Sequence, residues 1–380
     1  MSGSSRLSLA LDSGALALPA EGRIALFAPR AGVNDADLAA LARPRCHVIT
    51  GFRPDRDHFE NLGYACADAP EGRYGAAVVF LARARALSEA LIASACAVSD
   101  GPVVVDGAKS DGIETLLRAC RRRAEVAPPL SKGHGKLFHF PAGPGFADWQ
   151  AGPPRQIAGG FVTAPGIFSA DGIDPGSALL ADHLPARLGA QVADLGAGWG
   201  YLAARVLARA RGARDGDMPQ MPDGPEGPEG PETRGTPDFA DRRDRPRRRD
   251  KPGPRGAEIA QIHLVEADRV ALDCARRNLS DPRACFHWQD ATRWQPEQPL
   301  DTVITNPPFH AGRRPDPGLG LAFIAAAARI LAPRGQLFLV ANRHLPYEAQ
   351  LQRLFREVTE FGGDQRFKLL HAARPVRPGA

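Results

Sequence analysis

The stretch that decides the fold is Asp301-Thr302-Val303-Ile304-Thr305-Asn306-Pro307-Pro308-Phe309-His310. Its first half is rich in apolar and β-branched residues, a pattern typical of a buried strand. The two prolines end that strand, because proline has no N–H to donate to a sheet. The residue before a proline prefers extended backbone, so we expect Asn306 at the strand tip. Ligands of open α/β sheets bind beyond the carboxyl ends of the strands, and the stretch therefore predicts a site at Asn306.

This tip suits the methylation of an exocyclic amino group on a nucleobase. The lone pair of that nitrogen is delocalised into the ring, so the nitrogen is a poor nucleophile. The Asn306 side-chain oxygen and the Pro307 carbonyl could accept its two hydrogens, and Phe309 offers a face on which the base stacks. We therefore take Asn306, Pro307, Pro308 and Phe309 as candidate catalytic residues. A turn that merely closes a strand explains the prolines equally well, because the chain contains 35 of them.

Length and composition limit the class of protein. A chain of 380 residues is too long for one ordinary core, so two domains are expected. The net charge of +5 permits a nucleic-acid partner without requiring one. The six cysteines contain no CxxC pair, which predicts neither a zinc site nor a disulfide framework and fits a reducing cytoplasm. No apolar run approaches the length of a membrane span. We expect a cytoplasmic protein without a metal centre.

The first half of the chain, residues 1–142, alternates short apolar runs with helical patterns. Expected strands are residues 23–27, 47–50, 76–81, 103–106 and 136–140, with helices near 35–42, 87–94 and 113–123. This alternation indicates a parallel α/β sheet. No strand carries an acidic residue leading into a Gly-x-Gly loop, so we expect a nucleotide-binding type of fold without its nucleotide loop. A scaffold or RNA-docking role is favoured over a second active site. The Gly- and Pro-rich segment 143–155 is expected to be a linker.

The second half, residues 156–380, contains the stretch Asp194-Leu195-Gly196-Ala197-Gly198-Trp199-Gly200 after an expected strand at 191–195. Glycines here let backbone approach a ligand closely. A dinucleotide fingerprint counted from Gly196 would need glycine at 201, where Tyr201 stands. An acid directly before the loop suits a cationic ligand, and S-adenosylmethionine carries both a sulfonium and an amino group. We therefore expect S-adenosylmethionine, held by Asp194, Gly196, Ala197, Gly198 and Gly200.

Acidic residues follow the next two expected strands as well. Glu266 follows the strand at 262–265 and can take both ribose hydroxyls, whereas Asp290 follows 285–288 and can accept from an adenine amino group. Each acid alone is more often solvated or a helix cap, the role expected for Asp268. Acids at three successive tips favour a nucleoside ligand, with Asn306 beside it. There is neither a phosphate-binding GxxxxGK[ST] loop nor a defensible Ser-His-Asp arrangement.

Several other segments complete this half. Asp174 is expected to cap a helix that runs to about residue 183. Two further strands, at 335–341 and 368–372, with a helix at 348–357 between them, are expected to finish the sheet. Residues 211–256 have almost no apolar side chains and are expected to be a disordered insertion. The basic part of this insertion could contact RNA phosphates, but a tolerated loop without a role is favoured.

At this point the sequence resembles the bacterial small-subunit (16S) ribosomal RNA guanine-N2-methyltransferases of the RsmC type. The resemblance rests on Pro165-Gly166-Ile167-Phe168-Ser169, on Asn306-Pro307-Pro308-Phe309-His310-x-Gly312 and on Asn342-Arg343-His344-Leu345-Pro346-Tyr347-Glu348. It covers nearly the whole chain outside residues 211–256. It implies two tandem Rossmann-like methyltransferase domains, the N-terminal one degenerate and the C-terminal one a class I S-adenosylmethionine-dependent methyltransferase.

The resemblance also implies a guanine amino group of 16S ribosomal RNA as the methyl acceptor. Ala197 departs from it, because relatives often carry cysteine there. Other amino-methyltransferases remain as alternatives, acting on 23S ribosomal RNA guanine N2, adenine N6 or a protein glutamine. A non-catalytic RNA-binding module that keeps the cofactor fold is the more distant alternative.

Overall fold

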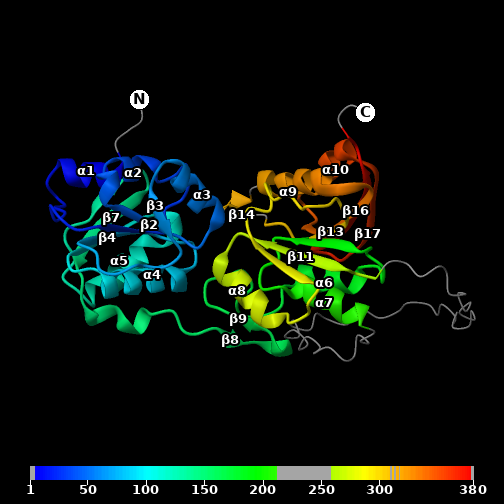
Figure 1. Cartoon of the computed structure of the whole chain (residues 1–380). Coiled ribbons are helices and arrows are strands. Elements are labelled where there is room, and N and C mark those ends of the chain that lie inside the picture. The colour runs from blue at the N-terminus through cyan, green and yellow to red at the C-terminus, as the bar shows by residue number, and fades with distance from the viewer. Residues whose placement is uncertain (1–4, 212–257, 309, 312–313, 316, 378–380) are drawn as a thin grey trace, which may run out of the picture.

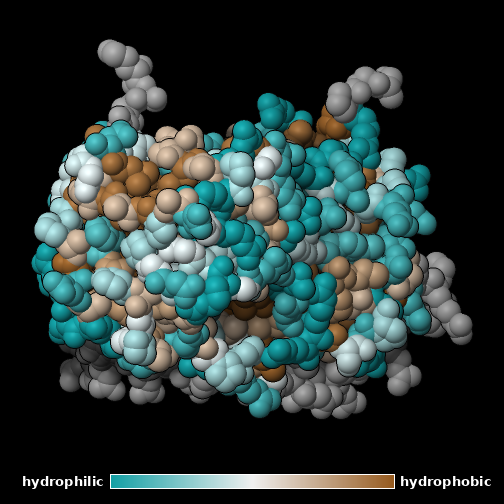
Figure 2. All heavy atoms as spheres, turned by 60° about the vertical axis from the view of Figure 1, so that its left-hand side comes forward, coloured by the Kyte–Doolittle hydropathy of each residue, from teal (hydrophilic) through white to brown (hydrophobic). Residues whose placement is uncertain are grey.

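The structure of the protein is a computed structural model that describes residues 5–211, 258–308, 310–311, 314–315 and 317–377. It consists of two α/β domains that lie side by side (Figure 1), each built on one seven-stranded sheet. This confirms the expected fold class. Hydrophobic residues gather at the upper left of the face in Figure 2 and at the base of a recess near its centre. Within the described ranges, no helix is long and apolar enough to cross a membrane.

The sheet of the N-terminal domain has the order β3-β2-β1-β4-β5-β7-β6. Its parallel strands are β1 (Ile24–Phe27), β2 (Cys46–Ile49), β3 (Ala65–Ala67), β4 (Ala76–Phe80) and β5 (Pro102–Ala108). β7 (Gly135–Pro141) runs antiparallel to β5, and β6 (Leu130–Lys132) runs antiparallel to β7. The expectation of an all-parallel sheet was therefore wrong at this edge. β3 and β6 escaped prediction because three residues are too few to show a periodic pattern.

Helices cover both faces of this sheet (Figure 1). They are α1 (Arg6–Asp12), α2 (Asp35–Ala39), α3 (Arg53–Asn61), α4 (Arg85–Val98) and α5 (Ile113–Arg121), with 3-10 turns at Arg43–Arg45, Lys109–Asp111 and Pro144–Trp149. β1 and β4 are buried along their whole length, as parallel strands covered on both faces must be. Phe146, from the expected linker, lies in the core of this domain, so the first part of that segment packs with it.

The C-terminal sheet repeats the same order as β12-β11-β10-β13-β16-β18-β17. The parallel strands are β10 (Gln191–Leu195), β11 (Gln261–Glu266), β12 (Ala284–Trp288), β13 (Leu300–Thr305) and β16 (Leu331–Asn342). β18 (Phe367–Pro375) and β17 (Phe355–Gly363) form an antiparallel edge. The helices are α6 (Pro175–His183), α7 (Tyr201–Ala210), α8 (Arg269–Asn278), α9 (Pro317–Ile330) and α10 (Glu348–Leu354), with a 3-10 turn at Ala158–Gly160. Two small hairpins join β8 (Arg155–Gln156) to β9 (Val162–Thr163) and β14 (His310–Ala311) to β15 (Arg314–Pro315).

One expected helix at the C-terminal edge was wrong in its second part. α10 ends at Leu354, and β17 begins at Phe355. Arg356 and Glu357 are good helix formers, but Val358 and Thr359 are β-branched, and β17 pairs along most of its length with β18. Pairing with a distant strand therefore overrides the local helical preference. The C-terminal sheet therefore contains one strand more, β17, than the sequence predicts.

The two domains touch through the segments that follow β2 and β11. The Arg53 N–H donates to the Ala267 carbonyl, and the Arg269 N–H donates to the Gly51 carbonyl, both at 2.9 Å. The indole N–H of Trp288 contacts the same two carbonyls, at 2.9 Å to Ala267 and 3.2 Å to Gly51. The guanidinium groups of Arg53 and Arg269 lie over its ring. The N-terminal domain thus braces the turn that leaves β11.

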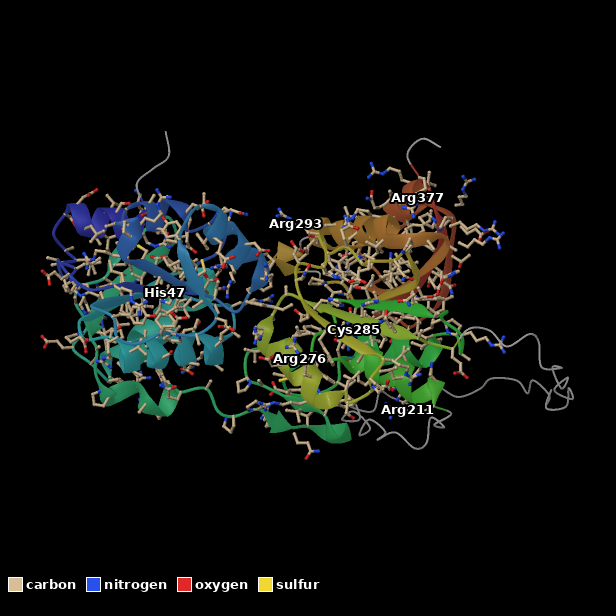
Figure 3. All side chains as sticks on the ribbon, in the orientation of Figure 1. His47, Arg211, Arg276, Cys285, Arg293 and Arg377 are labelled. Atoms are coloured by element: carbon tan, nitrogen blue, oxygen red, sulfur yellow. The ribbon has the colours of Figure 1, made fainter. Side chains whose placement is uncertain are left out.

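The thiols lie in both domains. All six cysteines are free, and three of them are buried in the N-terminal core. Burial raises the pKa of Cys46 to about 11 and that of Cys120 to about 12. Cys285, labelled in Figure 3, lies on β12, at one edge of the C-terminal sheet. Buried thiols with a raised pKa are weak nucleophiles, so the N-terminal cysteines act as packing residues.

Candidate active site

The strand tip at Asn306 is held by the start of α6. Asn306 Nδ2 donates to Asp174 Oδ2 and to Ser177 Oγ, both at 2.8 Å. Asp174 also caps α6 by accepting from the Ser177 backbone N–H at 2.7 Å, as expected. A carboxylate only accepts hydrogen bonds, so the nitrogen end of the Asn306 amide must face Asp174. Within the part of the chain that the structure describes, no donor is bonded to its oxygen, which can accept from a ligand.

A pocket of about 50 Å³ lies at this tip. Its walls come from the loop after β10, from the first turn of α7, from the loop before α6 and from the tip of β13. The lining residues are Phe168, Ser169, Asp174, Ser177, Gly196, Ala197, Gly198, Trp199, Tyr201, Leu202 and Asn306. The structure therefore brings predicted residues of the glycine loop together with Asn306.

The glycines of the loop serve different purposes. Gly196, Gly198 and Gly200 all have left-handed backbone, with φ of 70°, 55° and 88°. A Cβ at Gly198 would meet nothing within 4 Å, so the space beside it is open to a ligand. A Cβ at Gly200 would lie 2.6 Å from Leu279 Cδ1. Gly200 therefore lets α7 pack closely, and it does not line the pocket.

Asp194 precedes this loop and is fully buried, at 0% exposure. Its Oδ2 accepts from the Ala203 N–H at 3.3 Å, but Oδ1 has no hydrogen-bond partner among the described residues. Burial raises the pKa of the Asp194 carboxyl to about 8. A buried acceptor without a donor destabilises the fold, and an ammonium group would satisfy it. The site thus fits S-adenosylmethionine, whose amino group supplies such a donor.

Glu266, at the end of β11, is tied to the glycine loop. Its Oε2 accepts from the Gly198 N–H and its Oε1 from the Asp268 N–H, both at 2.8 Å. Burial raises the pKa of Glu266, and these N–H groups oppose that rise. Asp268 caps α8 as expected, accepting from the N–H groups of Val270 and Ala271 at 2.8 and 3.3 Å. Glu266 is therefore placed beside the loop, one residue before the interdomain contact.

Asp290, Pro307 and Pro308 are not among the residues that line the pocket. Asp290 Oδ1 accepts from the backbone N–H and hydroxyl of Thr292, at 2.8 and 2.6 Å, which closes a turn. Pro307 is buried and Pro308 is exposed. Phe309 lies outside the described residues. The roles of these four residues stay predictions.

Sequence reasoning missed part of the pocket. Asp174 was expected only as a helix cap and Ser177 had no expected role, yet both hold the Asn306 amide. Phe168 lines the pocket and is 60% exposed, which is unusual for so large an apolar side chain. The signal available for the first pair was the Asp-Pro-Gly-Ser stretch, but its hydrogen bond to Asn306 joins residues 132 positions apart.

Comparisons with known proteins agree with this geometry. The methyltransferase small domain family matches residues 158–217 and 255–371. The ribosomal RNA large subunit methyltransferase G of Ectopseudomonas mendocina is 30% identical over 55% of this chain, which spans only 44% of that relative's length. The ribosomal RNA small subunit methyltransferase C of Pseudomonas aeruginosa is 27% identical over 84% of each chain.

Among solved structures, the T. thermophilus 16S rRNA N2 methyltransferase (RsmC), in complex with AdoMet and guanosine, has the same fold. Its TM-score is 0.68 at 23% sequence identity, over 97% of this chain and 92% of that one. The likeness therefore extends over both domains. The C-terminal half of the chain therefore contains a methyltransferase small domain, and the whole chain is similar in sequence to a small subunit methyltransferase C and in fold to an RsmC structure.

Proposed function

We propose that the protein methylates the exocyclic N2 amino group of a guanine in 16S ribosomal RNA of the small subunit, using S-adenosylmethionine. The observation that carries this proposal is the fixed orientation of Asn306. Asp174 and Ser177 occupy the nitrogen end of its amide, so an acceptor oxygen is presented at the pocket. An amino group is the kind of substrate atom that such an oxygen holds. A cytoplasmic location, where ribosomal subunits are made, is part of the proposal.

Each residue around the pocket has a separate role in this proposal. Asp194 would pair with the amino group of the cofactor, the open backbone at Gly198 would lie against it, and Glu266 would take the ribose hydroxyls. When bound, S-adenosylmethionine supplies an electrophilic methyl group. Asn306 Oδ1 and the Pro307 carbonyl accept the two N2 hydrogens and so make the nitrogen lone pair available for attack. As the N–C bond forms, the bond from the methyl carbon to sulfur would break and leave a neutral thioether, and one N2 proton would pass to solvent water. Positioning supplies most of the acceleration, because the sulfonium is already a good leaving group.

The proposal requires an extruded or unpaired target base. An amino group within a base-paired stack is shielded by its neighbours, and enzymes that act on such groups extrude the base or take single strands. The exposed ring of Phe168 at the pocket supports this requirement, because an aromatic face holds an unstacked base without reading its sequence.

A second substrate deserves testing beside the first. Relatives named ribosomal RNA large subunit methyltransferase G are 30% and 34% identical to this chain, over shorter stretches than the small-subunit relative. Methylation of a guanine N2 in 23S ribosomal RNA would use the same residues in the same roles. The small-subunit assignment is favoured by the relative that is matched over 84% of each chain.

The test is methyl transfer from labelled S-adenosylmethionine to free 16S RNA, free 23S RNA, small subunits and large subunits, followed by nucleoside mass spectrometry. We expect N2-methylguanosine in 16S RNA or in small subunits. N2-methylguanosine confined to 23S RNA would move the substrate to the large subunit. N6-methyladenosine would overturn the guanine assignment, and absence of label from every RNA would overturn the RNA substrate.

A further inference from the structure

A second and larger cavity lies between the two domains. Its volume is about 760 Å³, and its walls are the first turn of α4, the segment 152–155 and the loop 165–175. Ser169 and Asp174 line both this cavity and the pocket at Asn306. The interdomain cleft, as we call this cavity, therefore borders the candidate active site at these two residues. Any chain that enters the pocket from this side must lie in it.

The loop that separates the two cavities is seated on the N-terminal domain. Gly166 has a φ of +92°, and a Cβ there would lie 3.2 Å from Leu87 Cβ on α4. Only glycine allows so close an approach with this backbone. Ser169 is a non-glycine residue with left-handed backbone, at φ 52°. Such residues cluster at binding sites, and this one lies where the cleft meets the pocket.

The cleft presents exchangeable positive charge. Arg85 and Arg155 line it, with side chains 62% and 56% exposed. Arg85 pairs with Glu89 at 2.8 Å within α4, and Arg155 pairs with Asp171, whose side chain is 91% exposed. Exposed ion pairs contribute little, about 0–1 kcal/mol, so a phosphate can replace the carboxylate of either pair. The N-cap residue of α4, Ala84, gives no side-chain cap, and the 14 residues of this helix direct a positive dipole end at the same wall.

Apolar residues also line the cleft. Pro153, Pro165 and Ile167 line it together with the two arginines, with Asp171 and with the shared residues Ser169 and Asp174. Alternation of cationic and apolar surface suits an unpaired nucleotide, whose phosphate and base need different surroundings. The target guanosine must be unpaired or extruded to reach the pocket, so a single strand is the fitting occupant.

We propose that the interdomain cleft binds the single-stranded RNA that flanks the target guanosine, with one phosphate at Arg85 and the first turn of α4 and another at Arg155. The inference rests on the proposed function, because it assumes that the guanosine enters the pocket at Asn306. It assigns the degenerate N-terminal domain a part in substrate binding, through α4. It also explains why the loop 165–175 packs on that domain.

The experiment measures RNA binding without methylation, so its outcome is independent of turnover. A short fluorescent single-stranded oligoribonucleotide with one central guanosine is titrated with the full chain at several salt concentrations. The variant is Arg85→Ala/Arg155→Ala. The matched control is Arg118→Ala/Arg353→Ala, which removes one exposed arginine from each domain outside the cleft. Calorimetry with S-adenosylmethionine, and thermal unfolding, show whether each variant keeps its fold and its cofactor site.

The expected result is a weaker complex for the cleft variant and a salt dependence of log K that is shallower by about 1.4, which is the loss of two single-strand phosphate contacts. The control should have the affinity and salt dependence of the wild type. For each single variant, Arg85→Ala or Arg155→Ala, the slope should be shallower by about 0.7. Equal slopes and affinities for cleft variant and control would overturn the inference. If the cleft variant binds this RNA more weakly as expected, while the methyl-transfer test labels neither ribosomal RNA nor subunits, the proposed function alone is overturned.

Discussion

The two domains of this chain have the same strand order and differ in their strand tips. Phe27 of β1 pairs with Ile49 and Val79, just as Leu195 of β10 pairs with Val265 and Thr305. The next residue also behaves alike in the two domains: the Ala28 N–H donates to the Ile49 carbonyl, and the Gly196 N–H to the Val265 carbonyl, each at 2.9 Å. Both residues have left-handed backbone. The N-terminal domain thus keeps the turn of a cofactor loop.

The N-terminal domain lacks the polar side chains that Asp194 and Asn306 provide at the strand tips of the C-terminal domain. Counting from these paired residues places Leu26 at the position of Asp194, and Phe80 at the position of Asn306. Leu26 and Phe80 are both buried, at 0% and 2% exposure. The acceptors that would hold a cofactor and a substrate are replaced by core side chains. The comparison teaches that topology sets where a site can form, while a few tip residues decide whether it exists.

In the N-terminal domain, the strand tip after β2 contacts the C-terminal domain. Thr50, just after β2, is equivalent in register to Glu266, the last residue of β11, and the residues after each meet at the domain contact. The reciprocal hydrogen bonds between Arg53 and Ala267 and between Arg269 and Gly51 join equivalent places of the two sheets. Through these two hydrogen bonds, the segment after β2 holds the segment after β11 in place.

The largest effect should come from removing the acceptor that only the C-terminal domain has. Asn306→Ala should lower kcat by about 10²–10³-fold, as the loss of one preorganised hydrogen-bonding group does in other enzymes. Cofactor affinity measured by calorimetry should stay unchanged, because Asp194 and the glycine loop remain. A variant with near wild-type turnover would show that the amide does not activate the amino group.

The next largest effect concerns the buried acid before the loop. Asp194→Asn should weaken S-adenosylmethionine binding by about 10- to 100-fold, because a charge-assisted hydrogen bond contributes about 1.5–3 kcal/mol. The ligand-free wild type should lose stability as pH rises from about 4, the usual pKa of an aspartate, to about 8, the pKa to which burial raises Asp194, and the loss should level off above that pH. The loss follows because ionisation is disfavoured in the folded state and free in the unfolded one. Asp194→Asn should not show this loss in thermal unfolding, and identical pH profiles would contradict the assignment.

Asp174 should matter for the orientation of Asn306 separately from its role as a cap. Asp174→Ser keeps a good N-cap residue, but its shorter side chain releases the Asn306 amide, so kcat should fall about tenfold with unfolding temperature nearly unchanged. Asp174→Ala should lose the same activity and about 1 kcal/mol of stability. If Asp174→Ser keeps full activity, the carboxylate serves the helix alone.

The domain contact should respond to the loss of one N–H group. Trp288→Phe removes the indole donor shared by Gly51 and Ala267, and should destabilise the protein by about 1 kcal/mol. It should also raise the KM for the cofactor, because Ala267 follows Glu266. Trp149→Phe is the matched control, since Trp149 packs on Phe146 in the other domain. Equal effects of the two variants would exclude a special role for the contact.

The smallest effect tests the shared turn. Ala28→Gly should stabilise the protein by less than about 1 kcal/mol, because glycine adopts left-handed backbone freely but loses more entropy on folding. Gly196→Ala should destabilise it by about 1–2 kcal/mol, because alanine is strained at this φ. Its Cβ would also lie 3.1 Å from the ring of Phe323. Denaturant unfolding measures both changes, and effects of the same sign would refute the equivalence of the two turns.

The sequence predicts those parts of the molecule that local signals determine. The prolines after Asn306 mark the end of β13, the glycines after Asp194 mark the loop, and Asp174 marks the start of α6. What it cannot supply depends on partners distant in the chain. β17 forms because β18 pairs with it, and Asp174 finds Asn306 only after the sheet has assembled. The domain contact joins backbone groups, which leave no trace in the side-chain pattern.

The most direct measurement is a calorimetric titration of the full chain with S-adenosylmethionine, which counts the sites that two alike domains provide. We expect one equivalent bound per chain in the wild type and in Asn306→Ala, and strongly weakened binding in Asp194→Asn. Two equivalents per chain, or undiminished affinity in Asp194→Asn, would contradict the claim that the tip residues of the C-terminal domain alone make the site.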